Sequence, residues 1–174
     1  MIQVTDNIVL KAISLEAAKD IFNTINNERE YLRQWLPFID LTLQEEDSLA
    51  FIESAIEHEQ ITYTIHFDDK FVGLIGFNNM DKPNQKAEIG YWLSEKYQGQ
   101  GIITQSVLKL LHQAFGELQL NSIRILAGVE NKKSRSIPER LGFKQEGILR
   151  DGELLVDNQF TDIVVYSLLK KEFY

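Results

Sequence analysis

The chain has 174 residues, 44% of them hydrophobic and 25% charged, and carries a formal net charge of −8. Its length predicts one domain over residues 1–174, with a substantial core. Because there is no cysteine, disulfides, thiolate metal sites and a thiol nucleophile are excluded. No apolar run approaches the roughly 18 residues that a membrane span needs, and the first residues lack the pattern of a signal peptide. We therefore expect a cytoplasmic protein that uses no metal.

Negative charge is concentrated in the first half of the chain. Residues 1–85 contain 6 Lys and Arg against 15 Asp and Glu, whereas residues 98–150 contain 8 against 4. The overall sign argues against general nucleic-acid binding. The division fits an anionic ligand bound by the second half together with a cationic co-substrate. It equally fits an acidic surface that maintains solubility.

The first half of the chain is expected to alternate between strand and helix without a linker. In chain order, the apolar spacing predicts a strand at 7–13, a helix from Ser14 to about residue 25, helices at 28–36 and 45–59, and strands at 61–67 and 71–78. Ser14 is the expected N-cap of the first helix. Pro37 should end the second helix, and Asp68-Asp69-Lys70 should form a hairpin turn.

The second half continues the same alternation. The expected elements are a strand at 87–93, a helix carrying Ile103, Val107, Leu110 and Ala114, a strand at 122–129, a short helix ending at Leu141, and strands at 143–149 and 160–168. Gly142 is the expected residue after the short helix. The strand–helix–strand step over 87–129 predicts parallel neighbours joined by a right-handed crossover. The fold class is therefore α+β, or mixed α/β, with a mostly antiparallel twisted sheet of about seven strands.

The run from Gln98 to Thr104, with the sequence Gln-Gly-Gln-Gly-Ile-Ile-Thr, is the most informative stretch of the chain. It lies between a predicted strand and a predicted helix, where backbone N–H groups are free and the helix dipole is positive. Such a turn suits a phosphate or pyrophosphate. Gly99 and Gly101 would let the ligand approach the backbone, although an ordinary strand-to-helix turn also uses glycine.

Four motifs in this order carry a family resemblance. They are Glu88-Ile89-Gly90-Tyr91-Trp92-Leu93, Tyr97-Gln98-Gly99-Gln100-Gly101-Ile102, Asn131-x-x-Ser134 and Glu139-Arg140-Leu141-Gly142-Phe143. The chain resembles the GCN5-related N-acetyltransferase (GNAT) superfamily over nearly its whole length. Within it, the RimL/RimJ-like branch, which acetylates ribosomal-protein N-termini, is the most similar. The segment Leu32-Arg33-Gln34-Trp35-Leu36-Pro37 looks like that branch's helical segment beside the substrate groove.

The resemblance implies a single acyl-CoA N-acyltransferase domain, with helices on both faces of the sheet and acetyl-CoA as co-substrate. The cofactor-binding residues would be Leu93, Asn131, Ser134 and the loop residues Gln98, Gly99, Gln100, Gly101, Ile102, Ile103 and Thr104. The loop would bind the pyrophosphate through its backbone N–H groups. Ile103 stands where the family motif usually ends on a small residue, as it does in some RimL-like members.

The same resemblance implies catalytic roles, except for Glu88, which is the candidate base because it lies on the same predicted strand as Leu93. A backbone N–H near Leu93 would stabilise the thioester oxyanion, and Glu88 would deprotonate the acceptor amine through a water. Asn131 would bond the pantetheine amides and Ser134 would donate to the departing sulfur, since Pro138 stands where many members have a tyrosine. A structural carboxylate is the alternative for Glu88, and a helix cap is the alternative for Asn131 and Ser134.

The residues expected to line the acceptor groove are the aromatics Tyr31, Trp35, Phe38 and Trp92, for which core packing is the alternative. The predicted function is acetyl transfer to a primary amine by direct attack in a ternary complex, with the N-terminal α-amine of a ribosomal protein as the favoured acceptor. A polyamine or aminoglycoside acceptor is the alternative within this chemistry. A non-catalytic acyl-CoA sensor is the alternative from another class. The family resemblance also implies a homodimer.

Overall fold

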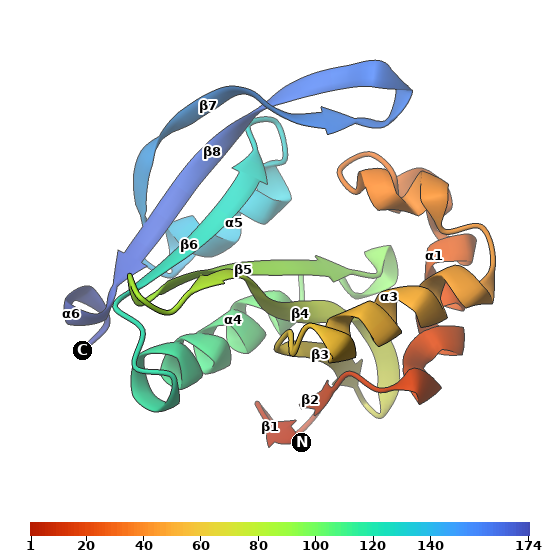
Figure 1. Cartoon of the computed structure of the whole chain (residues 1–174), viewed down its shortest axis with the longest axis horizontal. Helices are drawn as coiled ribbons and strands as arrows, with labels where there is room; N and C mark the ends of the chain where they lie inside the picture. Colours follow the sequence, from red (N-terminus) through yellow and green to blue (C-terminus); the bar gives the residue numbers. More distant parts are fainter. The chain divides into compact units, whose positions relative to one another are not determined.

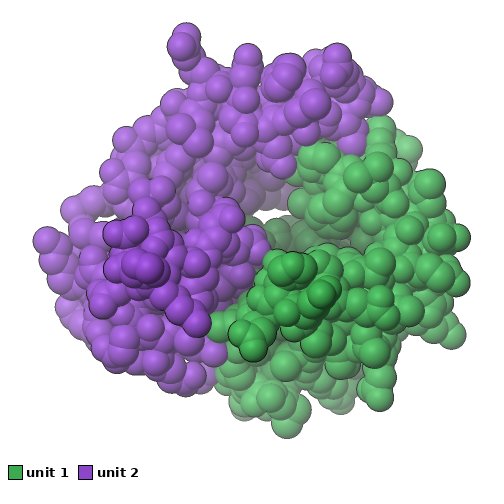
Figure 2. Space-filling model, in the orientation of Figure 1, with its two compact units in different colours: residues 1–76, 91–106 green, residues 77–90, 107–174 purple.

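The computed structural model describes the whole chain, from Met1 to Tyr174. Figure 2 shows two compact units: unit 1 consists of Met1–Gly76 and Tyr91–Ser106, and unit 2 consists of Phe77–Gly90 and Val107–Tyr174. Two strands and one helix contribute residues to both units, because the boundaries fall inside them.

The eight strands are ordered β1-β2-β3-β4-β5-β6-β8-β7 (Figure 1). Their bounds are β1 Ile2–Gln3, β2 Ile8–Ala12, β3 Thr62–Phe67, β4 Lys70–Asp81, β5 Lys86–Leu93, β6 Ser122–Gly128, β7 Lys144–Leu155 and β8 Gln159–Leu169. Most pairs are antiparallel, whereas β5 and β6 are parallel. The predicted mixed α/β class and the predicted parallel pair are both confirmed.

The helices connect these strands. Their bounds are α1 Ala18–Asn27, α2 Arg29–Leu32, α3 Glu45–Glu57, α4 Ile102–His112, α5 Lys132–Arg140 and α6 Lys170–Phe173. Short 3-10 turns are η1 Leu15–Ala17, η2 Pro37–Leu41, η3 Glu95–Tyr97 and η5 Val156–Asn158, and η4 Gln113–Glu117 is a π-helical segment.

Three local predictions differ from the structure. Ser14 precedes the turn η1 rather than α1, and its side chain makes no capping bond. The predicted helix over 28–36 is limited to the four residues of α2, and Pro37 begins η2 instead of only ending a helix. Proline suits the first position of a helical turn because the N–H it lacks has no partner there. Strand β1 was not predicted, since two residues cannot display an alternating pattern.

The strands β7 and β8 of the last hairpin are also longer than the strands that the sequence pattern predicts. The pairing register shifts between Leu149 and Glu153, where Asp151 has a φ of +49°. An irregularity of this kind interrupts the alternation from which strands are predicted. The turn at Asp68 and Asp69 agrees with prediction, with both residues at positive φ between β3 and β4.

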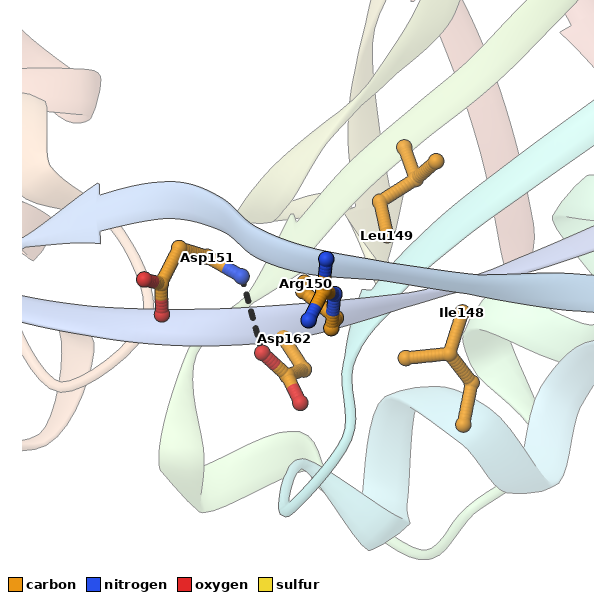
Figure 3. A pocket seen from close by; sticks show the side chains of 5 residues that line it. All are labelled: Ile148, Leu149, Arg150, Asp151 and Asp162. Atoms are coloured by element: carbon orange, nitrogen blue, oxygen red, sulfur yellow. Dashed lines mark hydrogen bonds between the residues drawn. The ribbon is translucent and has the colours of Figure 1, made fainter.

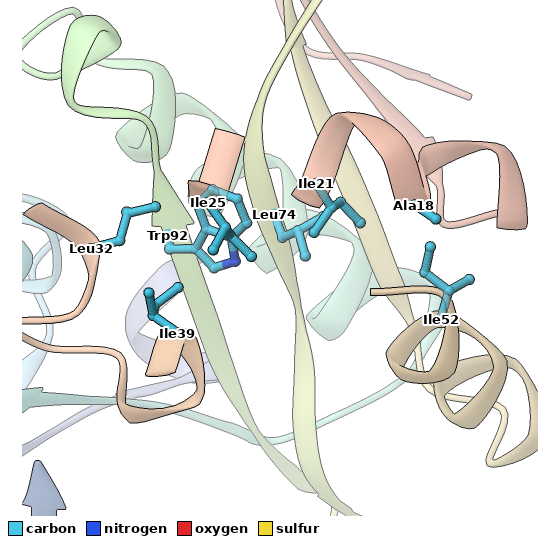
Figure 4. Packing of buried hydrophobic residues seen from close by; sticks show 8 residues of the cluster. All are labelled: Ala18, Ile21, Ile25, Leu32, Ile39, Ile52, Leu74 and Trp92. Atoms are coloured by element: carbon cyan, nitrogen blue, oxygen red, sulfur yellow. The ribbon is translucent and has the colours of Figure 1, made fainter. Parts of the chain in front are cut away.

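The core of unit 1 forms where four helical elements pack against two strands. Helix α1 presents Ala18, Ile21 and Ile25 at helical spacing. Figure 4 shows the whole cluster, which also contains Leu32, Ile39, Ile52, Leu74 and Trp92. Because its side chains come from α1, α2, η2, α3, β4 and β5, this cluster sets the position of the helices beside the end of β5.

Strands β4 and β5 approach closely within this unit. A β-carbon at Gly73 would lie 2.2 Å from the backbone oxygen of Trp92 and 3.0 Å from the Cα atom of Leu93. Only glycine permits backbones to come this close. The end of β5 is therefore fixed by β4.

The core of unit 2 is built from alternating strand residues and one helical face. Ile123, Ile125 and Ala127 of β6 are buried in alternation. The second part of α4 and the segment η4 contribute further buried residues, namely Val107, Leu110, Leu111, Ala114 and Phe115. The helix after the loop is thus anchored by its apolar face, as its sequence spacing predicted.

We expect Gly73→Ala to lower the free energy of unfolding by about 1–3 kcal/mol, because the added methyl group must separate two strands. Urea denaturation would measure the change. Gly116→Ala is the matched control, since the nearest atom to its β-carbon is the Tyr174 hydroxyl at 3.9 Å. An equal effect of the two substitutions would contradict the close approach.

Candidate functional site

The loop before α4 has the geometry that its sequence predicts. Gly99 and Gly101 have φ angles of +72° and +74°, and a β-carbon at either position would meet nothing within 4 Å. The N–H of Gln105 donates to the carbonyl of Gly101 at 2.9 Å. The N–H groups of Ile102 and Ile103 precede this bond, so they lie at the positive end of α4 without intrahelical acceptors. The loop can therefore receive an anion from an open side.

The loop is attached to the end of β5. The side-chain amide of Gln98 donates to the carbonyl of Leu93 at 3.2 Å. The next N–H, that of Ser94, donates to the carbonyl of Val72 at 2.8 Å. The peptide group between Leu93 and Ser94 is thus bonded at both its oxygen and its nitrogen.

A further contact at this position was not anticipated from the sequence. The carboxylate of Glu28 accepts from the Ser94 hydroxyl at 2.6 Å and from the Glu95 N–H at 3.0 Å. Glu28 lies at the junction of α1 and α2, where its carbonyl accepts from Tyr31 and Leu32. No local pattern indicates this bond, because its partners are 66 and 67 residues away.

Glu88 is partly buried on β5, within unit 2. The side-chain amide of Asn79 donates to its Oε2 atom at 2.9 Å. In the parallel register, Glu88 lies opposite Arg124 of β6. The bond from Asn79 occupies only one of the two carboxylate oxygens. Glu88 can therefore be a structural carboxylate and still have a chemical role.

Helix α5 begins at Lys132, and Asn131 is its N-cap. The Oδ1 atom of Asn131 accepts from the N–H of Ser134 at 3.3 Å, so the capping alternative is realised for Asn131. Pro138 lies inside the helix and cannot donate to the carbonyl of Ser134, four residues before it. The cap does not use the side-chain nitrogen of Asn131, so its two N–H groups can still donate hydrogen bonds.

Three side chains connect α5 to β8. The Nε atom of Arg135 donates to the hydroxyl of Tyr166 at 2.9 Å, and that hydroxyl donates to Oε1 of Glu139 at 2.7 Å. The Nη1 atom of Arg135 also donates to the carbonyl of Val129, the residue after β6, at 2.8 Å. Tyr166 is 1% exposed, and its burial raises the pKa of its hydroxyl above the ordinary value of 10.0. Hydrogen bonds to the buried Tyr166 hydroxyl therefore fix the segment that carries Asn131 and Ser134.

The four predicted groove aromatics all belong to unit 1 but differ in exposure. Trp92 is 8% exposed and packs in the core, with its ring at 6.0 Å from that of Phe71. Phe38 is 42% exposed, and Trp35 and Tyr31 are partly buried. Burial raises the pKa of Tyr31, and the carboxylates of Glu95 and Glu28 raise it further. Phe38 therefore offers the most accessible ring of the four.

A separate hollow of about 680 Å³ lies on the hairpin of unit 2 (Figure 3). It is lined by Ile148, Leu149, Arg150, Asp151 and Asp162. The N–H of Asp151 donates to Asp162 Oδ1 at 2.8 Å and holds the irregular part of β7. No predicted site residue lines this hollow.

The predicted site residues fall into two groups. Unit 1 carries the loop, Leu93 and the four aromatics, and unit 2 carries Glu88, Asn131 and Ser134. No group of three or more His, Asp or Glu side chains is arranged to hold a metal ion. None of the helices is long and apolar enough to cross a membrane.

Comparison with known families agrees with this arrangement of strands and loop. The sequence pattern described as "Acetyltransferase (GNAT) domain" matches residues 7–144. The chain belongs to the GNAT acetyltransferase family. It is therefore an N-acetyltransferase whose acetyl donor is acetyl-CoA, as the four motifs predicted.

Individual relatives match the GNAT chain along nearly its whole length. It is 36% identical to YdaF of Bacillus subtilis, a provisionally named ribosomal N-acetyltransferase, over 98% of this chain and 96% of the relative. It is 32% identical to the ribosomal-protein-serine acetyltransferase of Escherichia coli, over 95% and 94%. Among solved structures, the microcin C7 self-immunity acetyltransferase MccE, in complex with acetyl-CoA and AMP, is 31% identical with a TM-score of 0.89, covering 97% and 95%. The predicted GNAT fold is thereby confirmed.

We expect Tyr166→Phe to lower the free energy of unfolding by about 1–3 kcal/mol at neutral pH, because Arg135 and Glu139 lose their shared partner. The raised pKa means that folded Tyr166 holds its proton more tightly than the unfolded chain does. The stability that the protonated Tyr166 hydroxyl contributes is fully present below pH 10, and it is lost as the pH rises through the pKa of Tyr166 in the folded state. Urea denaturation of both proteins at neutral pH and above pH 10 would therefore show their difference narrowing, and a constant difference would contradict the assignment.

Proposed function

We propose that this enzyme acetylates the N-terminal α-amine of a ribosomal protein, by direct attack of the amine on acetyl-CoA in a ternary complex. The observation that carries the proposal is the 32% identity, over nearly all of both chains, to the ribosomal-protein-serine acetyltransferase of Escherichia coli. The similarity to YdaF supports the same acceptor class. We further propose that residues 1–174 act as a single acetyltransferase domain in the cytoplasm, as a homodimer.

The loop Gln98–Thr104 is assigned to the pyrophosphate of acetyl-CoA. Its support is the positive φ of Gly99 and Gly101, with open space where their β-carbons would lie. A side chain at either position would hold the phosphates away from the backbone N–H groups. Since backbone groups make the contact, Ile103 in place of a small residue does not weaken it.

The backbone N–H of Leu93 is assigned to the oxyanion that forms when the amine attacks. Preorganised backbone donors stabilise such charge without reorganising during the reaction. The bonds of the peptide group after Leu93, made by Gln98 and Val72, support a fixed backbone at this residue. No side-chain nucleophile is needed, in keeping with a chain that lacks cysteine.

Glu88 is assigned as the general base, acting through a water. The bond from Asn79 would orient its carboxylate while leaving the second oxygen for that water. The acceptor ammonium would thus lose its proton, by way of the water, to the carboxylate of Glu88, which lies on the same strand as Leu93.

Asn131 and Ser134 are assigned to the rest of acetyl-CoA. The free amide N–H groups of Asn131 would bond the pantetheine carbonyls, while its oxygen caps α5. The hydroxyl of Ser134 would donate to the departing thiolate, a role for which Pro138 offers no group. The aromatic rings of Tyr31, Trp35 and Phe38 are assigned to the acceptor side, with Phe38 the most exposed. Trp92, the fourth predicted groove residue, packs in the core instead.

A small-amine acceptor is the second candidate function. MccE is as similar in sequence as the Escherichia coli ribosomal-protein enzyme, and its name points to microcin C7 rather than to a ribosomal protein. The excess of acidic residues over positions 1–85 suits a polyamine or an aminoglycoside as well as a basic peptide.

A screen with labelled acetyl-CoA separates the acceptors. Total ribosomal proteins, polyamines and aminoglycosides would be tested in parallel arms, and release of CoA thiol would be measured in each. We expect label on the N-terminal α-amine of a ribosomal protein, and none after that amine is chemically blocked. Labelling of a small amine alone would favour the second candidate. Binding of acetyl-CoA without thiol release in any arm would favour the sensor.

We expect Ser134→Ala to lower kcat at saturating acetyl-CoA by about 100-fold, because the thiolate would leave without a donor. Steady-state kinetics at saturating acceptor would measure the loss. Ser136→Ala is the matched control in the same helix, since its hydroxyl bonds the carbonyl of Lys133. Unchanged turnover of Ser134→Ala would show that another group protonates the sulfur.

A further inference from the structure

Glu28 has no role in the chemistry proposed above, yet its carboxylate accepts hydrogen bonds from the two residues that follow β5. Its oxygens accept from the hydroxyl of Ser94 at 2.6 Å and from the N–H of Glu95 at 3.0 Å. Ser94 is 3% exposed, so the first bond is shielded from competing water. Charged acceptors form stronger hydrogen bonds than neutral ones.

The position of these bonds in the chain gives them a consequence for the site. Ser94 follows Leu93 directly, and Glu95 begins the turn η3, which leads to Gln98 and the loop. The Ser94 N–H is bonded to Val72, and the Leu93 carbonyl to Gln98. Glu28 thus completes a set of bonds that fixes the backbone between the proposed oxyanion donor and the proposed pyrophosphate loop.

Glu28 is itself held by the acceptor-side helices. It ends α1 and precedes α2, and its backbone carbonyl accepts from Tyr31 and Leu32. Leu32 is buried in the unit 1 core. One residue therefore connects the helix that carries Tyr31 to the strand end that carries Leu93, and all these residues lie within unit 1.

We propose that Glu28 is a positioning residue for acetyl transfer, which aligns the Leu93–Gln98 backbone with acetyl-CoA and couples it to the acceptor-side helix α2. The inference rests on the proposed roles of Leu93 and the loop. Glu28 touches neither substrate; it acts through Ser94 and Glu95. Loss of alignment of reacting groups by about 1 Å can cost 100-fold in rate, so removing one of these bonds affects both binding and turnover.

The test compares acetyl-CoA affinity, measured by calorimetry, with kcat at saturating substrates, well below the unfolding transition. We expect Glu28→Gln to raise the Kd for acetyl-CoA and to lower kcat, each about tenfold, because an amide provides only one oxygen for two donors. Ser94→Ala should have a similar effect by removing the hydroxyl alone. Glu57→Gln is the control, because it removes an exposed carboxylate that no contact engages.

A double-mutant cycle separates positioning through this bond from independent effects. The variant Glu28→Gln/Ser94→Ala should be no worse than the more affected single variant. The inference would be overturned if the losses of the two single variants multiplied in the double variant. It would also be overturned if Glu28→Gln kept its Kd and kcat within twofold of wild type. If Glu28→Gln does not fold, the Kd and kcat of Ser94→Ala are the test, with the same twofold limit. Absence of acetyl transfer by the wild type would refute the proposed function, whereas the Kd values would still test Glu28.

Discussion

Strand β5 lies so close to β4 that a β-carbon at Gly73 would be 2.2 Å from the Trp92 backbone oxygen, and this approach determines where the strand ends. Its last residue, Leu93, is followed by a peptide group bonded to Gln98 on one side and Val72 on the other. The glycine loop and the first turn of α4 continue from that point. The direction of the backbone N–H groups in this segment therefore depends on how the two strands pack.

The helix after the loop, α4, is held by a different interaction, the burial of its apolar face. Its first N–H groups precede the bond from Gln105 to Gly101 and therefore need an external acceptor. The buried residues Val107, Leu110 and Leu111 hold the remainder of the helix by hydrophobic contact. Anchoring by apolar burial keeps the polar end of the helix available for an anion.

The segment carrying Asn131 and Ser134 is fixed by polar contacts instead. Pro138 weakens α5 from within, and the helix is short. The bonds that join Arg135 and Glu139 to the buried hydroxyl of Tyr166 compensate for this by fastening the helix to β8. Asn131 caps the helix with its oxygen, so the same residue that is assigned to acetyl-CoA also sets the start of the helix.

Periodic apolar residues sufficed to predict most strands and helices, because burial imposes that periodicity directly. The strand–helix–strand order predicted the parallel pair β5–β6, and the short polar run at Asp68 predicted the turn. Elements whose form depends on distant partners were not predictable in the same way. The two-residue strand β1 exists through its pairing with β2, and the irregularity of β7 was visible only in its register with β8.

The sequence by itself determined the family, the acetyl donor and the candidate site residues, since the glycine loop and the spaced motifs Glu88, Asn131 and Ser134 are local signals. Only the tertiary structure decided that Trp92 is packed in the core and that Asn79 bonds Glu88. The same holds for Tyr166, which joins α5 to β8, and for Glu28, which meets Ser94 across 66 residues. These contacts join residues far apart in the chain, and a hydrogen bond between distant residues leaves no periodic trace in a single sequence.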